Sequence, residues 1–137
     1  MKNCIFCKIV TRELPCYKIY EDKNFLAFLD IQPISKGHTL IIPKKHYNTF
    51  LETPVEILSA MTSIIHKVGQ SILKTTGADG LNFGLNNGAA AGQIIMHTHF
   101  HIIPRFNGDG LHTWPSVKCS EEEFKNISEK IKNNLIN

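Results

Sequence analysis

The segment His97-Thr98-His99-Phe100-His101 places three imidazoles at alternate positions. Successive side chains of a β-strand point to opposite faces, so this spacing predicts a strand with the histidines on one face and Thr98 and Phe100 on the other. At a rise of about 3.3 Å per residue, the outer imidazoles begin roughly 13 Å apart and cannot both bind one metal ion. The pattern therefore predicts a face for chemistry and a face for packing, with at most two neighbouring histidines sharing an ion.

Runs of aliphatic, β-branched and aromatic residues between Gly, Pro, Asn and Asp predict about five strands. These runs lie at residues 17–20, 25–30, 39–42, 81–86 and 95–103. The strands follow one another with one long helical crossover, which favours an α+β fold, an antiparallel sheet with the helices on one face, over parallel winding. The length suits a single domain, residues 1–137, with no repeat or linker.

Two helices are expected. The first begins at Thr53, with Pro54 at its first position and Glu56 completing a capping box, and it ends at Gly77. The second lies near the C-terminus and opens with a capping box at Ser120. Its apolar stripe is narrow and consists of Phe124, Ile127, Ile131 and Leu135.

Charge and hydropathy exclude several classes of partner. A net charge of +3 and a pI near 8.7, without a basic stripe, predict no binding to DNA or RNA. The N-terminal apolar run is too short for a signal peptide, and no window reaches transmembrane length. We therefore expect a cytoplasmic protein that does not bind membranes.

The four cysteines fall as a Cys4-x-x-Cys7 pair and two isolated residues, Cys16 and Cys119. In a reducing compartment this pattern argues against a disulfide framework. A thioredoxin-like motif should lie between a strand and a helix, whereas this pair opens the chain, so zinc is favoured over a redox role. Zinc would need two further ligands, which histidines can supply, and the alternative is that both cysteines simply pack as small apolar residues.

Residues 86–93 are rich in Gly and Ala and directly precede the histidine strand. Small residues let a backbone approach a ligand closely, so this segment predicts a loop beside a phosphate group. The alternative is a flexible hairpin turn.

The motifs together resemble the histidine triad (HIT) family of nucleotide hydrolases and transferases. The matching segments are residues 97–103, 25–31, 37–46 and 92–93, and the resemblance covers the chain from Cys4 to about Trp114. Residues 104–114 look like the zinc-bearing bacterial-type branch of that family. The resemblance also implies a homodimer in which the two sheets join near the long helix.

The resemblance implies a structural zinc ion held by Cys4, Cys7, His46 and His97. A tetrahedral site with all four positions filled by protein is a scaffold rather than a Lewis acid. Coordination would also fix the tautomer and orientation of His97.

The resemblance further implies that His99 is a nucleophile, with His101 and His38 donating hydrogen bonds to the phosphate. The expected reaction is hydrolysis at the α-phosphate of purine nucleoside phosphoramidates or dinucleoside polyphosphates. It passes through a nucleotidyl-histidine and releases AMP.

The family's substrate contacts map onto five further residues. Asp30 is expected to bind the ribose hydroxyls, because a carboxylate accepts from two hydroxyl groups. Asn86 and Gln93 are expected to act as neutral donors near the phosphate. Phe6 and Ile31 are expected to line the base pocket.

One position departs from the family pattern, since Ile94 stands where relatives often carry Ser or Thr. The change removes a hydroxyl donor on the leaving-group side. It supports an alternative function, a purine-nucleotide-binding or interaction module with weak or vestigial activity. A third reading makes His97 and His99 joint ligands of a hydrolytic metal.

Overall fold

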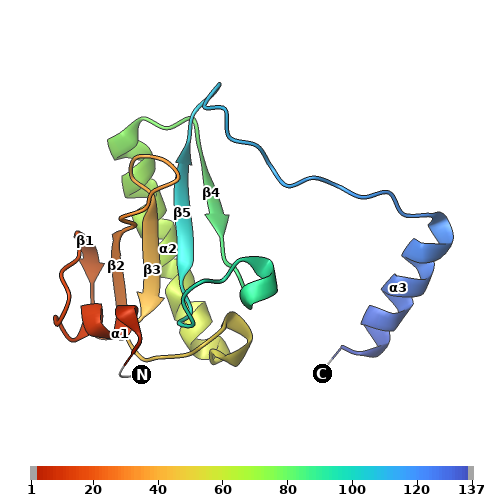
Figure 1. The fold of residues 1–137 in the computed structure, drawn as a ribbon, viewed down its shortest axis with the longest axis horizontal. Coiled ribbons are helices and arrows are strands. Elements are labelled where there is room, and N and C mark those ends of the chain that lie inside the picture. The colour runs from red at the N-terminus through yellow and green to blue at the C-terminus, as the bar shows by residue number, and fades with distance from the viewer. Residues whose placement is uncertain (1–2, 136–137) are drawn as a thin grey trace.

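The computed structural model describes residues 3–135 of the chain. Five antiparallel strands form one sheet in the order β1-β2-β3-β5-β4 (Figure 1). The strands are β1 (Lys18–Glu21), β2 (Phe25–Leu29), β3 (Thr39–Pro43), β4 (Gly80–Gly84) and β5 (Phe100–Arg105). The predicted α+β class, with its five-stranded antiparallel sheet, a long helix and a C-terminal helix, is confirmed.

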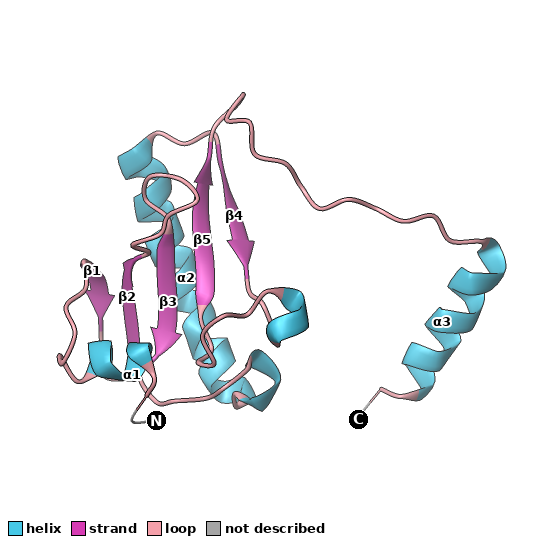
Figure 2. Ribbon diagram, in the orientation of Figure 1, coloured by secondary structure: helices cyan, strands magenta, loops and turns pink. Residues whose placement is uncertain are grey.

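The helices do not share one face of the sheet, so that part of the prediction is wrong. They are α1 (Ile5–Val10), α2 (Val55–Thr76) and α3 (Glu121–Asn133), with 3-10 turns η1 (Phe50–Glu52) and η2 (Ala89–Ala91). Helix α2 runs along the sheet, and α3 stands away from it at the end of a long arm (Figure 2). Within residues 3–135, no helix is both long and apolar enough to cross a membrane.

Alternation along the inner strands divides the hydrophobic core into two parts, one on each face of the sheet. The part under α2 contains Phe25, Ala27, Ile41, Met61, Val68, Ile72 and Ile102. The part on the opposite face contains Leu26, Phe28, Leu40, Ile42 and Phe6 of α1. The short α1, which the sequence pattern did not predict, thus closes the face of the sheet opposite α2.

Helix α2 ends as expected but does not begin as expected, and α3 begins as expected. The N-cap of α2 is Pro54, and the Thr53 hydroxyl donates to the Thr49 carbonyl at 2.8 Å instead of capping the helix. The capping box predicted at Thr53 is therefore wrong. Gly77 ends α2 in the left-handed conformation with φ 65°. The capping box between Ser120 and Glu123 is present and opens α3.

The histidine strand is shorter than predicted, because β5 begins only at Phe100. Just before β5, Thr98 forms hydrogen bonds with the segment that follows β3 instead of extending the strand. The Thr98 N–H donates to the Tyr47 carbonyl at 2.7 Å, and the Thr98 and Thr53 hydroxyl oxygens lie 2.8 Å apart. This buried pairing fixes the segment that carries the first two histidines.

Candidate active site and metal centre

The three alternating histidines lie on the α1 side of the sheet, as their spacing predicts. The Phe6 ring packs edge-on against His97 and His99, with ring centroids 5.8 and 5.2 Å apart. The His99 and His101 ring centroids are 5.0 Å apart. The intervening Phe100 packs against the core under α2. The alternation therefore separates a row of imidazoles from the packing face.

The hydrogen bonding of His99 assigns its tautomer. Its Nδ1 lies 2.6 Å from the carbonyl oxygen of His97, and a carbonyl can only accept. Nδ1 therefore carries the proton, and Nε2 keeps a lone pair. His99 is buried except for a small edge, with 7% of its surface exposed. A neutral imidazole held in this way presents one nitrogen as a nucleophile.

A second chain of hydrogen bonds assigns the tautomers of His38 and His101. The Ile34 N–H donates to His38 Nδ1 at 3.1 Å, so the proton of neutral His38 is on Nε2. That Nε2–H points at His101 Nδ1, 2.8 Å away. His101 Nδ1 therefore accepts, and its own proton is on Nε2. One backbone amide thus makes His101 Nε2 a hydrogen-bond donor.

Burial keeps the imidazoles of this row neutral at pH 7. Loss of hydration lowers the pKa of His101 to about 4, helped by the neighbouring His99 and His38. Burial also lowers the pKa of His38 and of His99. The hydrogen bond from His99 to the His97 carbonyl and the series from Ile34 through His38 to His101 both require neutral rings. The lowered pKa values therefore agree with the hydrogen-bond geometry.

These lowered pKa values predict that the protein loses stability in acid. Unfolded His101 binds its proton near pH 6.5 and folded His101 only near pH 4, so folding is opposed by protonation as the pH falls between these values. We expect the unfolding free energy of His101→Asn to depend less steeply on pH in this window, by up to about 1.4 kcal/mol per pH unit. Urea unfolding of the wild type and of His101→Asn, at a fixed zinc concentration across this pH window, measures the two pH dependences. Equal slopes would contradict the buried neutral state of His101.

Cys4, Cys7, His46 and His97 form a compact group, with ligand atoms within 4.8 Å of one another. The Cys7 Sγ to His46 Nδ1 distance is 3.3 Å, and His97 Nδ1 lies 3.5 Å from Cys4 Sγ and 3.7 Å from Cys7 Sγ. Thiolate and imidazole ligands of one tetrahedral zinc ion would lie about 3.6 Å apart. The group therefore has the dimensions of a tetrahedral Cys₂His₂ site.

The outer nitrogens of both ligand histidines support the same conclusion. His97 Nε2 donates to the Pro43 carbonyl at 2.8 Å, and His46 Nε2 lies 3.0 Å from Asn48 Oδ1. Both Nδ1 atoms then carry lone pairs directed at the cysteines. Burial and the adjacent Cys4 raise the pKa of Cys7 to about 11. A thiolate here needs a cation, so the donor set suits a metal ion.

A second group of possible ligands, Asp30, His38 and His101, does not suit a metal ion. A metal would need the lone pair of His38 Nε2, which would move the proton to Nδ1. That proton would face the Ile34 N–H, so two donors would oppose each other. This group is therefore better described as a hydrogen-bonded pair of histidines beside a carboxylate.

The geometry also contradicts a hydrolytic metal shared by His97 and His99. His97 directs Nδ1 at the cysteines and donates from Nε2 to Pro43, so neither of its nitrogens remains free. His99 Nδ1 donates to the His97 carbonyl. The two histidines are thus joined through the backbone and not through a common ion.

The three polar residues expected at the substrate, Asp30, Asn86 and Gln93, are all already hydrogen-bonded. Asp30 Oδ1 accepts the Gln32 N–H at 2.8 Å, and Oδ2 lies 3.7 Å from His38 Nε2. Asn86 Nδ2 donates to the Gly92 carbonyl at 3.3 Å. The buried Gln93 amide donates to the carbonyls of residues 48 and 95. Its amide hydrogens therefore fix the loop at residues 86–93 in place.

The apolar residues expected near the substrate differ in exposure. Phe6 is 3% exposed and contacts Phe28 as well as the histidines, so it packs inside the site. Ile31 is 76% exposed, and Ile94 is 91% exposed. The structure therefore places one aromatic ring against His99 and leaves two isoleucines on the surface.

The most important contacts that the sequence reasoning missed come from the backbone. The Pro43 carbonyl orients His97, and the Ile34 amide orients the His38–His101 pair. No residue type signals such contacts. Asn48, which accepts from His46, is different, because an amide side chain two residues from a candidate metal ligand is a recognisable partner.

Comparison with known proteins points to one family. The family model described as the HIT domain matches residues 11–108. An adenylylsulfatase of Arabidopsis thaliana is 50% identical over 123 residues, covering 90% of this chain and 61% of its own length. The chain thus spans about three fifths of that relative. An adenosine 5'-monophosphoramidase of Schizosaccharomyces pombe is 43% identical, covering 97% of this chain and 98% of its own.

Solved structures agree with these relatives. A HIT family protein from Bacillus subtilis superposes with a TM-score of 0.91 and 40% identity, covering 98% of this chain and 99% of its own. A zinc-bound histidine triad family protein from Mycobacterium smegmatis has a TM-score of 0.77 and 36% identity, covering 96% and 97%. Sequence and structure comparisons therefore agree on both family and fold.

Proposed function

Because this chain belongs to the histidine triad family, we propose that it hydrolyses nucleotides at the α-phosphate through His99 and releases AMP. The observation that carries this proposal is the 2.6 Å contact from His99 Nδ1 to the His97 carbonyl. It leaves Nε2 of a buried, neutral imidazole as the reactive atom.

In the proposed first step, His99 Nε2 attacks the α-phosphorus and forms a P–N bond, while the bond to the leaving amine or phosphate breaks. His101 Nε2–H donates a hydrogen bond to the negative charge that develops on the phosphate, and the departing amine or phosphate takes up its proton from water. Water then attacks the nucleotidyl-histidine, so that the P–N bond breaks and AMP departs. His99 regains its neutral form with Nε2 free.

The proposed substrates are AMP conjugates, phosphoramidates or dinucleoside polyphosphates. The relatives named as an adenylylsulfatase and as an adenosine 5'-monophosphoramidase support an adenylyl group joined to a leaving group. We assign the ribose to Asp30, the base to Phe6 and Ile31, and a phosphate contact to Asn86. For Gln93 we propose a supporting role, because its amide holds the neighbouring loop.

We also propose that zinc occupies the Cys4, Cys7, His46 and His97 group, as the zinc-bound relative and the donor geometry support. The ion would supply a fixed tetrahedral junction between the N-terminal segment and the chain before β5. His97 would then hold its carbonyl rigidly against His99 Nδ1. We propose a homodimer as the working form.

Release of AMP from adenosine 5'-phosphoramidate, diadenosine tetraphosphate and adenylyl sulfate tests the proposal. Cleavage of at least one compound by the zinc-loaded protein is expected, and the compound cleaved fastest identifies the leaving group. If the protein binds AMP but cleaves none of them, the binding-module function, which Ile94 suggests, would replace this proposal.

His38 provides a more specific test of the hydrogen-bonded pair. His38→Phe removes the donor to His101 Nδ1, so we expect kcat to fall by about 10²-fold with little change in KM. His38→Gln retains an N–H donor and should lose less. Steady-state kinetics of both variants on the preferred substrate measure this. Equal losses in both variants would show that the donor to His101 is not what matters.

A further inference from the structure

The loop before β3, residues 31–37, supplies the backbone amide that orients the His38–His101 pair. The Ile34 N–H donates to His38 Nδ1 at 3.1 Å, and His38 Nε2 lies 2.8 Å from His101 Nδ1. The opposite arrangement, with the proton of His38 on Nδ1, would bring two N–H donors face to face. It would also leave His101 Nε2 with a lone pair where the proposed reaction needs a donor. The position of the Ile34 amide therefore determines whether His101 can donate.

The loop itself has few contacts that could hold this amide in place. Five of its seven residues, all except Ser35 and Gly37, are exposed. Within residues 31–37, all of which the structure describes, Ser35 is the only residue whose side chain forms a hydrogen bond with another element. Exposed loops with little buried surface open locally at a low free-energy cost. The loop therefore depends on a small number of hydrogen bonds for its position.

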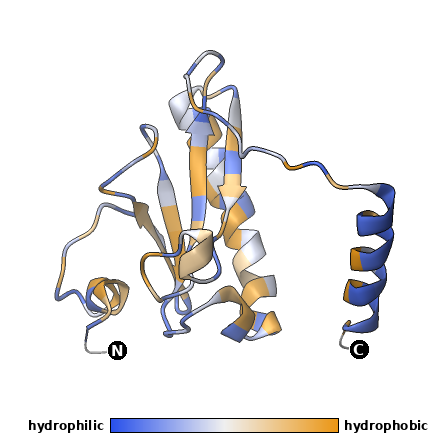
Figure 3. Ribbon diagram, turned by 45° about the vertical axis from the view of Figure 1, so that its right-hand side comes forward, coloured by the Kyte–Doolittle hydropathy of each residue, from blue (hydrophilic) through white to orange (hydrophobic). Residues whose placement is uncertain are grey.

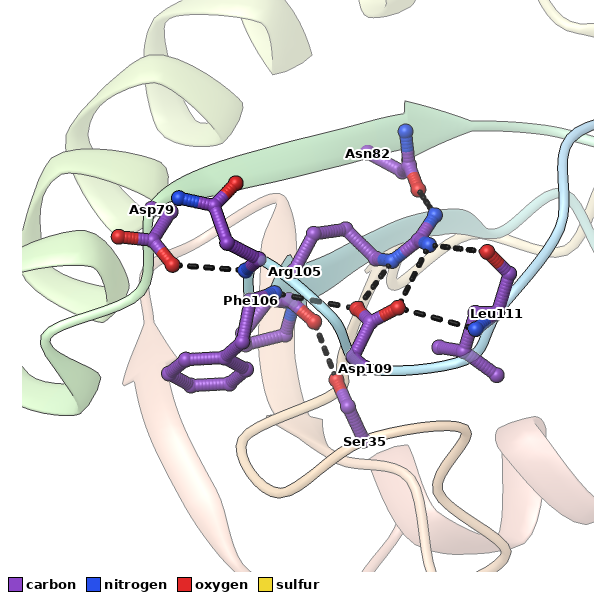
Figure 4. Close-up of polar contacts among 9 residues, drawn as sticks. Ser35, Asp79, Asn82, Arg105, Phe106, Asp109 and Leu111 are labelled. Carbon is purple, nitrogen blue, oxygen red and sulfur yellow. Dashed lines mark hydrogen bonds and ion pairs between the residues drawn. The ribbon is translucent and has the colours of Figure 1, made fainter.

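Strand β5 has a buried backbone carbonyl beyond the start of β3. Strand β3 begins at Thr39, which pairs with Ile102, so the Pro104 carbonyl has no partner in β3. Pro104 is buried, and the inner strands of the sheet are mainly hydrophobic (Figure 3). A buried carbonyl needs a hydrogen-bond donor. The Ser35 hydroxyl supplies that donor at 2.6 Å (Figure 4).

The acceptor of this bond lies on a firmly held part of β5. The Arg105 guanidinium donates to both carboxylate oxygens of Asp109, at 2.8 and 3.0 Å, and to Asn82 Oδ1 of β4 at 2.7 Å (Figure 4). The Asp79 N–H donates to the Arg105 carbonyl at 3.0 Å. These contacts join the end of β5 to β4 and to the turn that follows. The Ser35 hydroxyl therefore connects an exposed loop to a fixed strand.

Gly37 lets the loop lie close enough for this bond. Its φ is 97°, and a Cβ here would lie 3.3 Å from Pro104 Cγ and 3.0 Å from Thr76 Cγ2. The loop thus rests on the same proline that accepts the Ser35 hydroxyl. The Ser35 carbonyl accepts the His38 N–H at 3.0 Å. One residue is therefore bonded both to β5 and to the histidine whose tautomer the loop sets.

We propose that Ser35 is a positioning residue. Through its bond to the Pro104 carbonyl, it holds the Ile34 amide against His38 Nδ1. The amide in turn keeps the proton of His101 on Nε2, where it can donate to the substrate phosphate. Pro104 and His101 belong to the same strand, so these contacts form a closed ring that starts and ends on β5. The inference rests on the proposed function for its effect on turnover, whereas the tautomers can be observed without catalysis.

Three variants of the full, zinc-loaded chain test the proposal. Ser35→Ala removes the hydroxyl, and Ser35→Thr retains one. Ser128→Ala is the matched control, because the exposed Ser128 hydroxyl also donates to a backbone carbonyl, that of Lys125 in α3, at 2.9 Å. Long-range ¹H–¹⁵N NMR spectra of the histidine rings distinguish a nitrogen that carries a proton from one with a lone pair. Steady-state kinetics on the preferred substrate give kcat and KM, and far-UV circular dichroism checks the fold.

In the wild type at neutral pH, we expect the protons of His38 and His101 on Nε2. Ser35→Ala should show a second population in which the His101 proton is on Nδ1. Its kcat should fall by about 10-fold, with KM changed by less than about 2-fold, because the donor is lost in part of the molecules. This loss is smaller than that of His38→Phe, since the histidine pair itself remains. Ser35→Thr and Ser128→Ala should keep the wild-type tautomers and lose less than about 3-fold in kcat.

The His99 ring is an internal control in the same spectra, because the His97 carbonyl sets its tautomer independently of the loop. An unchanged His101 tautomer in Ser35→Ala would overturn the inference. So would a tautomer change at both His99 and His101, which would indicate a general disturbance, or an equal loss of kcat in Ser35→Ala and Ser35→Thr. A wild type that cleaves no substrate would refute the proposed function, and the tautomers of Ser35→Ala would still decide the inference.

Discussion

His99→Ala should abolish AMP release, with kcat/KM falling by about 10³-fold or more on every substrate that the wild type cleaves. The variant removes the imidazole whose Nε2 lone pair is fixed by the 2.6 Å bond from Nδ1 to the His97 carbonyl. Neither ring nitrogen of His99 belongs to the Cys₂His₂ group, so the variant should keep the zinc content of the wild type. Activity and metal content measured on the same samples test both statements.

His66→Ala is a suitable control, because His66 is exposed on α2 and should leave turnover unchanged. A His99→Ala variant that retains turnover within about 10-fold of the wild type would exclude His99 as the nucleophile. A variant that is inactive and also lacks zinc would instead place His99 among the metal ligands, contrary to the contacts of its nitrogens.

Loss of the metal should have the largest effect on stability. Cys7→Ser, or removal of zinc by a chelator, should lower the free energy of unfolding by about 3 to 5 kcal/mol, because the proposed ion would join residues 4–7 to the segments after β3 and before β5. The midpoint of thermal unfolding should fall by about 10 °C or more. Calorimetry with and without added zinc measures both quantities.

Cys119→Ser provides the matched control, since Cys119 is exposed and outside the group, and it should unfold like the wild type. If Cys7→Ser keeps one zinc ion per chain and its full stability, the Cys₂His₂ assignment is wrong. A loss of zinc without a loss of stability would mean that the ion is bound but does not support the fold.

Much of the fold follows from local patterns in the sequence. The apolar runs of β2 and β3 predict these strands, because both faces of the inner strands are buried. Alternation at residues 97–101 predicts that the histidines share one side, although β5 itself begins only at Phe100. Gly77 and Ser120 mark helix ends through their backbone and capping preferences. The apolar stripe of α3 follows from the spacing of its residues by three and four positions, and no motif is needed to predict it.

The remainder depends on contacts between distant segments. The Thr53 hydroxyl pairs with the hydroxyl of Thr98, which lies 45 residues away in the sequence. It therefore does not cap α2 as its sequence context suggests. Helix α1 is six residues long, too short to show helical periodicity, and is held by packing of Phe6. The placement of α3 away from the sheet has no signal in the sequence either, because an amphipathic stripe does not say which chain covers it. The cytoplasmic location stays a prediction.

The candidate site was predicted at the level of residue types and not at the level of hydrogen bonds. The Cys4-x-x-Cys7 spacing predicted two possible metal ligands, the resemblance to the family added His46 and His97, and the structure places the donor atoms of all four together. The tautomers depend on the Pro43 and His97 carbonyls and on the Ile34 amide, which any residue could supply. The sequence therefore identifies the histidines of the candidate site, and the tertiary contacts determine which ring nitrogen of each one keeps a lone pair.

Trapping of the covalent intermediate tests the central claim most directly. Rapid acid-free quenching of the zinc-loaded protein with adenosine 5'-phosphoramidate or diadenosine tetraphosphate, followed by peptide mass spectrometry under alkaline conditions, locates any bound nucleotide. We predict one adenylyl group on the peptide that contains residues 97–101, on His99, and none in His99→Ala. Turnover without any adenylylated histidine, or an adenylyl group on His101, would contradict the account.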